Sequence, residues 1–328
     1  MKKIAILLTV LISIILILPG CQNTKKETIR LNEVVRSIFY APQYVALEKG
    51  FFEEEGLEIE LSTGWGADKS MAALLSNNAE IALMGPEASI YVYNEGQENY
   101  AISFAQLTQR AGNFLIGREP SPDFQWEDVK GKTIIGGRPG GMPQLVLEYI
   151  LKQNGIEPFS DVEIITNIQF SATAGSFVGG TGDYTAEFEP TASKLENEET
   201  GYVVASLGTA SGKVPYTTYM ATKEYLAGNE DVIQGFTNAI YKGQIWVEDH
   251  TPAEIAEVIQ PYFEETDLKL ITQIVERYKS QDTWRTDPYF DEGGYDLLLD
   301  ILETGGQLEK APEFEVLVNN TYAEKTME

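Results

Sequence analysis

The chain of 328 residues contains one histidine and one cysteine, so the side chains that most often carry catalysis or bind transition metals are scarce. His250 follows a predicted helix over 231–248, where an imidazole complements the negative end of the helix dipole. A hydrolase needs a nucleophile with a base beside it, and the sequence suggests no such pair. We therefore expect a protein that is not an enzyme and has no cofactor and no metal site.

Residues that could bind a ligand gather instead in glycine-containing turns, such as TGWGAD (63–68), GPE (85–87) and GGRPGGMPQ (136–144). Glycine lets a ligand approach the backbone, helix N-termini present free N–H groups, and aromatic rings stack on rings or cations. The candidate ligand contacts are Phe39, Tyr40, Trp65, Gly66, Glu87, Arg138, Gly140, Gly141, Phe170, Ser171 and Phe188.

Each candidate also has a purely structural explanation. Trp65 between two glycines fits a lid on a hydrophobic core as well as a wall for a ligand ring. GGRPGG (136–141) fits a tight turn before a helix, and it lacks both the ending of a phosphate loop and the spacing of a dinucleotide fingerprint. Among charges near the predicted cleft, Glu87, Asp183 and Glu187 are acidic and Arg110 and Arg138 are basic.

The elements that must position these turns alternate between strand and helix. Strands are predicted at 29–35, 57–61, 80–84 and 100–107, with helices between them, and the pattern restarts at 132–136. Such alternation favours α/β layers with a mostly parallel sheet, and ligands of open α/β sheets bind beyond the carboxyl ends of the strands.

The pattern predicts two lobes followed by a helical tail that returns to the first lobe. Residues 29–117 and 220–328 form the first lobe in this interpretation, and residues 118–219 form the second. The chain would cross between lobes near 115–118 and 217–221, two short extended segments that fit hinge strands.

The formal net charge of −26 makes nucleic acid and anionic membrane surfaces poor partners. High solubility outside the cell explains this charge without reference to any ligand. A bias against strongly anionic ligands is the more specific interpretation.

The N-terminal segment resembles a bacterial lipoprotein signal. Residues 1–20 carry two lysines and then an apolar run too short to span a bilayer, and LPGC (18–21) resembles a lipobox in which Cys21 receives the lipid. An ordinary signal peptide or a membrane anchor that contains a cysteine is the alternative. Residues 21–28 then form a polar tether.

Five segments in order resemble one protein family, the solute-binding proteins of ABC importers for nitrate, sulfonate and taurine, which also includes binders of thiamine and its pyrimidine precursors. They are YVALEKGFFEEEGLEIEL (44–61), AEIALMGPEA (79–88), WEDVKGKTIIGGRPGG (126–141), GDYTAEFEPTASKLE (182–196) and VPYTTYMATKEYL (214–226). In the fourth segment the family often carries tryptophan at the position of Phe188.

The resemblance implies the two-lobed periplasmic-binding-protein type II fold and a monomer, anchored by lipid at the extracytoplasmic face of the cell membrane. Its partners would be a small-molecule ligand and an ABC permease with a separate ATPase. Aromatic turns with acidic neighbours favour a thiamine-type or pyrimidine heterocycle. A sulfonate, taurine or nitrate anion is the alternative, and a catalytic relative of the thiamine-pyrimidine synthases fits less well.

The lipid anchor is testable through Cys21. We expect Cys21→Ser to release the protein from the membrane or to block its maturation, because no other thiol is present to accept the lipid. Membrane fractionation measures the release. The ligand affinity of the purified domain should not change, and a variant that stays membrane-bound would contradict the anchor.

Overall fold

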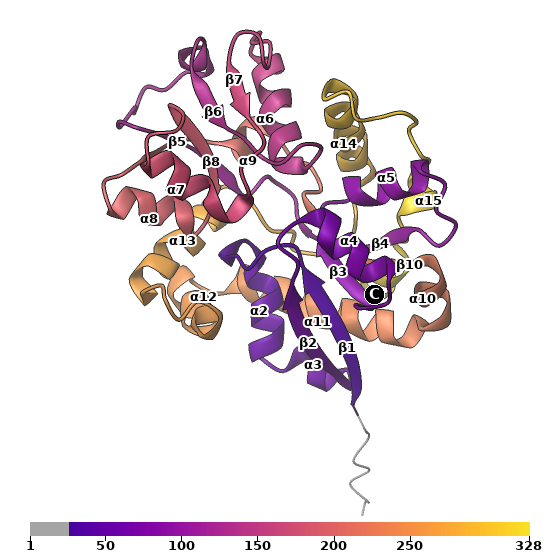
Figure 1. Ribbon diagram of the computed structural model, residues 1–328. Helices are drawn as coiled ribbons and strands as arrows, with labels where there is room; N and C mark the ends of the chain where they lie inside the picture. Colours follow the sequence, from indigo (N-terminus) through magenta and orange to yellow (C-terminus); the bar gives the residue numbers. More distant parts are fainter. Residues whose placement is uncertain (1–25) are drawn as a thin grey trace, which may run out of the picture.

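The computed structural model describes residues 26–328 as two lobes, each built around a five-stranded sheet (Figure 1). The predicted signal peptide, the lipidation site Cys21 and most of the predicted tether lie outside the described residues. Among residues 26–328, no helix combines the length and apolar character needed to cross a bilayer.

The first lobe holds a sheet of strand order β2-β1-β3-β10-β4. Its strands are β1 (Glu27–Glu33), β2 (Leu57–Thr63), β3 (Ile81–Met84), β4 (Ala101–Thr108) and β10 (Thr217–Thr222). Strand β1 pairs in parallel with β2 and β3, while β10 runs antiparallel between β3 and β4. Every residue of β3 is buried, as expected for a central strand that is covered on both faces.

The second lobe repeats this plan with strand order β7-β6-β8-β5-β9. Its strands are β5 (Asn113–Gly117), β6 (Thr133–Ile135), β7 (Glu163–Ile165), β8 (Tyr184–Phe188) and β9 (Tyr202–Ser206). Strand β5 is the antiparallel member here, because it pairs with β8 and β9 in the opposite direction. The first sheet thus includes one strand from much later in the chain, β10, whereas the second sheet is built from the consecutive strands β5 to β9.

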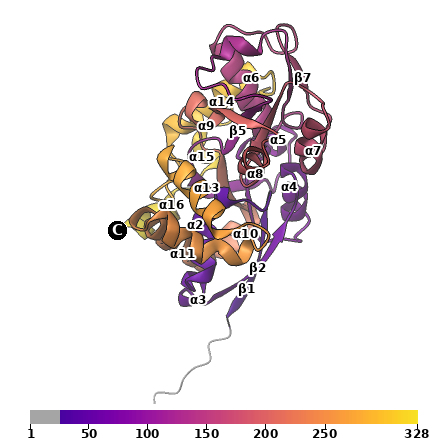
Figure 2. The ribbon, with the colours of Figure 1, turned by 90° about the vertical axis from the view of Figure 1, so that its left-hand side faces the viewer.

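Helices cover both faces of each sheet (Figures 1 and 2). Around the first sheet lie η1 (Ile38–Tyr40), α2 (Ala41–Glu48), α3 (Phe51–Glu54), α4 (Ala67–Leu75) and α5 (Glu87–Asn94). Around the second lie η2 (Trp126–Val129), α6 (Met142–Gln153), η3 (Phe170–Ala172), α7 (Thr173–Val178), α8 (Thr191–Asn197) and α9 (Leu207–Ser211). Several of these helices begin where a strand has just ended, which places their N-termini at the facing edges of the two lobes.

The chain passes between the sheets at residues 109–112, from β4 to β5, and at residues 212–216, from α9 to β10. Both connections come slightly before the predicted hinge strands, 115–118 and 217–221. Those segments are extended, as predicted, but they belong to β5 and β10 inside the sheets rather than to the connections. The predicted lobe boundaries at 117/118 and 219/220 stay a proposal. If the lobes move relative to each other, we propose that residues 109–112 and 212–216 are the hinge segments.

The C-terminal tail contacts both lobes, whereas the sequence assigned it to the first. It comprises α10 (Lys223–Gly228), α11 (Glu230–Asp249), α12 (Pro252–Ile259), η4 (Gln260–Tyr262), α13 (Leu268–Ser280), α14 (Glu292–Thr304), α15 (Phe314–Leu317) and α16 (Thr321–Met327). Helix α11 packs on α2 of the first lobe, whereas α14 packs on α6 of the second (Figure 2). On α13, Arg277 forms ion pairs with Glu189 and Glu196 of the second lobe at 2.6 and 2.7 Å.

Sequence periodicity located most elements but missed some short ones. The apolar periodicity of the tail predicts helices at 231–248, 252–262, 267–280 and 291–303. These agree with α11 to α14 within a few residues, and the last three residues of the second prediction form η4. Strand β8 was not predicted, because residues 184–188 carry buried threonine and glutamate among the apolar residues. The short helices α15 and α16 were also missed, since neither is long enough to show a clear helical period.

Tyr278 on α13 ties the tail to the first connection. Its hydroxyl donates to the carbonyl of Gly112 at 2.8 Å and accepts from the N–H of Glu189 at 3.3 Å, and the side chain is fully buried. Tyr278→Phe leaves both backbone groups without this partner, so we expect it to lower the free energy of unfolding by about 1–3 kcal/mol. Urea unfolding measures the loss. The half-buried Tyr241→Phe on α11 is the control, and equal stability of both variants would contradict this role.

Candidate functional site

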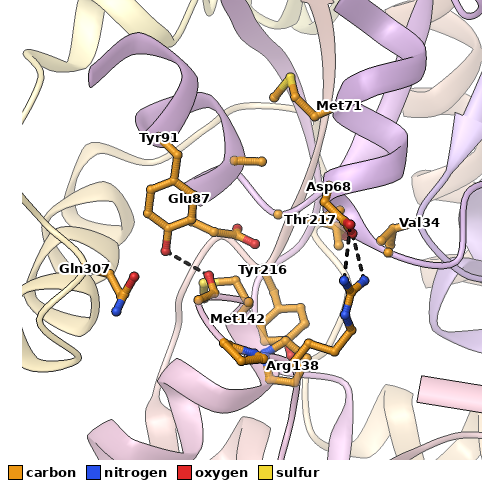
Figure 3. Close-up of a pocket in the computed structure, with 18 of the residues that line it drawn as sticks. Val34, Asp68, Met71, Glu87, Tyr91, Arg138, Met142, Tyr216, Thr217 and Gln307 are labelled. Atoms are coloured by element: carbon orange, nitrogen blue, oxygen red, sulfur yellow. Dashed lines mark hydrogen bonds and ion pairs between the residues drawn. The ribbon is translucent and has the colours of Figure 1, made fainter. Parts of the chain in front are cut away.

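A cavity of about 690 Å³ lies where the two lobes face each other. The first lobe contributes residues after β1, β2 and β3, and the second contributes the turn after β6 together with residues near the ends of β7 and β8. Figure 3 shows several of these side chains directed toward one another across the cavity. The carboxyl ends of the strands from both sheets therefore build one site, which is where open α/β sheets bind ligands.

Glu87 at the start of α5 places a carboxyl group inside this cavity. The side chain is 2% exposed, and its Oε2 has no hydrogen-bond partner among the described residues. Burial raises the pKa of Glu87 to about 7, although the backbone N–H groups of Glu87 and Met142 lower it. Its carboxyl oxygens fold back over Gly85, and a Cβ at that position would displace them.

Arg138 and Asp68 form an ion pair across the mouth of the cavity. The guanidinium of Arg138, after β6, lies 2.8 Å from Asp68 Oδ1 at the start of α4, and Figure 3 draws the two contacts between them. The hydrogen bond from Arg138 holds the pKa of Asp68 below its ordinary value. Exposed ion pairs contribute little stability, so this pair acts mainly as an orienting contact between the lobes.

A second contact between the lobes lies deeper in the cavity. The hydroxyl of Tyr91, one turn after Glu87 on α5, donates to the carbonyl of Gly140 at 2.8 Å. The backbone of Gly140 has φ +74°, a left-handed conformation that glycine adopts without a steric cost. The turn at 136–144 thus contributes one charged and one neutral contact between the lobes.

Aromatic rings form the remaining wall. Phe170 and Phe188 of the second lobe lie with ring centroids 5.7 Å apart, and Phe188 also contacts Tyr216 at 6.2 Å. Trp65 is 49% exposed and has φ +60°, a rare conformation for a residue other than glycine. An exposed tryptophan on strained backbone at a cavity is typical of a functional position.

Nine of the predicted ligand contacts line the cavity, namely Tyr40, Trp65, Gly66, Glu87, Arg138, Gly140, Gly141, Phe170 and Phe188. Phe39 does not line it, because its fully buried ring packs behind the wall against Tyr40 and Phe188. Ser171 lies instead in a smaller neighbouring cavity of about 370 Å³. Whether these residues bind a ligand stays a proposal.

The sequence analysis missed several lining residues, including Asp68, Met71, Tyr91, Met142 and Thr217. Asp68 stands inside the turn 63–68 that the sequence singled out, but nothing in the sequence alone indicated its pairing with Arg138. Tyr91 was detectable, because it follows Glu87 by four residues and residues at this spacing share one face of a helix. The tail contributes Gln307 and Glu309, which no local pattern predicts.

Three other predicted cleft charges lie elsewhere. Asp183 accepts a hydrogen bond from the N–H of Thr133 at 2.9 Å, and Arg110 donates to the carbonyl of Gly208 at 3.2 Å. Glu187 lines the smaller cavity, where hydroxyl groups of two threonines donate to its carboxylate. The main cavity therefore holds, among the described residues, one basic side chain, Arg138.

This geometry, two α/β lobes with a ligand-sized cavity between them, defines the class of periplasmic-binding-protein type II folds. A solved structure from Staphylococcus aureus, titled as the ligand binding component of an ABC-type import system, superposes with a TM-score of 0.75. It is 15% identical and covers 92% of this chain and 99% of that one. The similarity confirms the predicted fold.

The chain belongs to the NMT1/THI5-like family, whose profile matches residues 38–255. A relative from Bacillus subtilis, which carries the name "Putative binding protein YtlA", is 47% identical over 94% of this chain and 92% of its own length. The nitrate/nitrite binding protein NrtA of Synechococcus elongatus is 25% identical over 67% of this chain. This chain covers about half of NrtA, 54% of its length.

These relatives are binding proteins, which confirms the prediction that the chain is not an enzyme. Within residues 26–328, no cluster of three or more histidine, cysteine, aspartate or glutamate side chains has the arrangement of a metal site.

The buried carboxyl of Glu87 should make the ligand-free protein less stable at high pH. A carboxyl whose folded-state pKa is raised from 4.5 to about 7 stabilises the fold fully below the unfolded-state pKa. That contribution is lost as the pH rises through about 7. Glu87→Gln removes the ionisation, so we expect a gain of up to about 3 kcal/mol at pH 8 and little change at pH 5.

Urea unfolding at pH 5 and pH 8 measures this difference. Glu58→Gln on the exposed side of β2 is the matched control, since that side chain lies in solvent. An equal effect of Glu87→Gln at both pH values would show that the carboxyl does not change ionisation on folding.

Proposed function

We propose that the protein is an extracytoplasmic solute-binding protein that delivers a small organic molecule to an ABC importer. The observation that carries the proposal is the cavity itself, since both lobes line it and, within residues 26–328, only the connections 109–112 and 212–216 join the two sheets. A ligand that contacts both lobes favours the closed arrangement over the open one. Family membership and the named relatives support the same role.

The wall of the cavity favours a neutral or cationic heterocycle of the thiamine or pyrimidine type. Rings of Tyr40, Trp65, Tyr91, Phe170, Phe188 and Tyr216 line it, and aromatic faces stack on flat rings and attract cations. The charges agree with this preference, because among the described lining residues the one arginine, Arg138, is paired with Asp68 and none gives Glu87 a facing cation. Such a site disfavours a free anion.

A small anion such as a sulfonate, taurine or nitrate is the second candidate. Its support is the relative NrtA, which is named for nitrate and nitrite. An anion would have to bind through backbone N–H groups at the start of α5 or α6, where a helix N-terminus attracts negative charge. It would also require Glu87 to be protonated, because a carboxylate would repel it.

Lipid anchoring through Cys21 would keep the binding lobes close to their permease. Two acyl chains hold a protein at a membrane far better than one, and a short tether raises the local concentration of the lobes at the transporter. We expect the ATPase to be a separate subunit. A single lipid-anchored monomer is then sufficient for delivery.

A thermal-shift screen tests the ligand class. We expect thiamine, one of its pyrimidine precursors or riboflavin to raise the melting temperature, and taurine, alkylsulfonates and nitrate to leave it unchanged. A shift with sulfonates or nitrate alone would establish the anion candidate instead. Turnover of a substrate without any stabilising ligand would exclude the transport role.

Trp65 provides the quantitative check on this screen. We expect Trp65→Ala to weaken binding of the stabilising heterocycle by about 1–3 kcal/mol, because it removes a stacking face. Phe159→Ala is the matched control, since Phe159 is also an exposed aromatic residue with positive φ but lies outside the cavity. Unchanged affinity with lowered stability in Trp65→Ala would show that the ring serves the fold alone.

A further inference from the structure

Two buried polar atoms in the cavity lack partners among the described residues, namely Glu87 Oε2 and the hydroxyl of Tyr216. Their side chains are 2% and 3% exposed, and both residues line the cavity. Figure 3 shows both side chains at the same cavity. An unpaired buried polar group costs free energy, so two such groups at one cavity indicate that a ligand supplies their hydrogen bonds.

We propose that Glu87 and Tyr216 together recognise one edge of a ring, with Glu87 accepting from an N–H group and Tyr216 donating to a ring nitrogen or carbonyl. This inference rests on the proposed function and narrows its ligand class. The edge that fits is an exocyclic amine beside a ring nitrogen, as in an aminopyrimidine.

The surroundings hold both groups in place. Gly85 leaves room for the Glu87 carboxyl to fold back, and the backbone N–H of Met142 approaches the same carboxyl from the second lobe. The ring of Tyr216 lies edge-on to Phe39 at 5.7 Å, with an interplanar angle of 82°. Phe39 therefore serves the site from behind by fixing the direction of the hydroxyl.

The charges around Glu87 determine the sign of a proton effect. Tyr40, Tyr91 and Tyr216 face it as neutral phenols, because burial raises the pKa of each. The Arg138–Asp68 ion pair at the mouth of the cavity carries no net charge. Among the described residues that line the cavity, Glu95 and Glu309 add only negative charge. The backbone N–H groups of Glu87 and Met142 favour the ionised form of Glu87 only in part, and a donor from the ligand would favour it further.

Binding of an N–H donor near pH 7 should therefore release protons. Burial raises the pKa of Glu87 to about 7, so the ligand-free protein still holds part of this proton near pH 7, and a donor or cation favours the ionised form. Calorimetry in buffers of different ionisation enthalpy should detect the release of a fraction of a proton per ligand. An anion bound at the same place would instead take up protons, so the sign separates the two ligand classes.

The experiment compares 4-amino-5-hydroxymethyl-2-methylpyrimidine with the same ring lacking its amine, on the wild-type protein and on variants. We expect Glu87→Gln to weaken binding of the amine-bearing ring about 10- to 100-fold at pH 8 and to abolish proton release. The des-amino ring should bind both proteins within about threefold, which also shows that the variant is folded. Tyr216→Phe should cost about 3- to 10-fold for either ring.

Glu187→Gln is the matched control, because Glu187 is equally buried, has its pKa raised to about 7 and lies outside this cavity. It should leave the affinity within about twofold. Equal binding of the amine-bearing ring by wild type and Glu87→Gln would overturn the inference and leave the proposed function standing. Failure of thiamine, riboflavin and both rings to bind the wild type would overturn the heterocycle proposal and this inference with it.

Discussion

Two short connections between two separately packed sheets are the constraint on which this architecture depends. Within residues 26–328 the chain changes sheets at 109–112 and at 212–216, so each lobe completes most of its own core. The surfaces that face each other are left with turns and helix N-termini instead of interlocking side chains. A cavity between them follows, and so does the capacity of a ligand to change how the lobes meet.

Several residues that line the cavity lower the stability of the fold in positions where they can contact a ligand. The buried carboxyl of Glu87 and the hydroxyl of Tyr216, which lack partners among the described residues, cost folding free energy, and so does a tryptophan on left-handed backbone. The cores and the tail offset these costs, since Arg277 and Tyr278 bind the second lobe and the first connection. Strain and unsatisfied polar groups concentrate where both lobes can contact one molecule.

The sequence predicted the fold because the strand–helix alternation is local and strongly periodic. It also predicted most of the cavity wall, because glycine-rich turns after strands show where backbone can approach a ligand. It did not predict the pairing of Asp68 with Arg138, which depends on how the lobes meet. The sequence analysis predicted that Phe39 contacts the ligand, whereas its ring is buried behind the cavity wall. A sequence identifies aromatic residues near a turn but does not show which ring lines the cavity and which ring packs behind it.

Distance measurement between the lobes tests the central claim that the cavity closes on its ligand. Spin labels at Lys69→Cys on α4 and Gln153→Cys on α6, both exposed, can be attached selectively in a Cys21→Ser background. The account predicts a broad distance distribution without ligand that narrows toward its short end with saturating thiamine, or with whichever heterocycle stabilises the protein. An identical distribution with and without that ligand would contradict it.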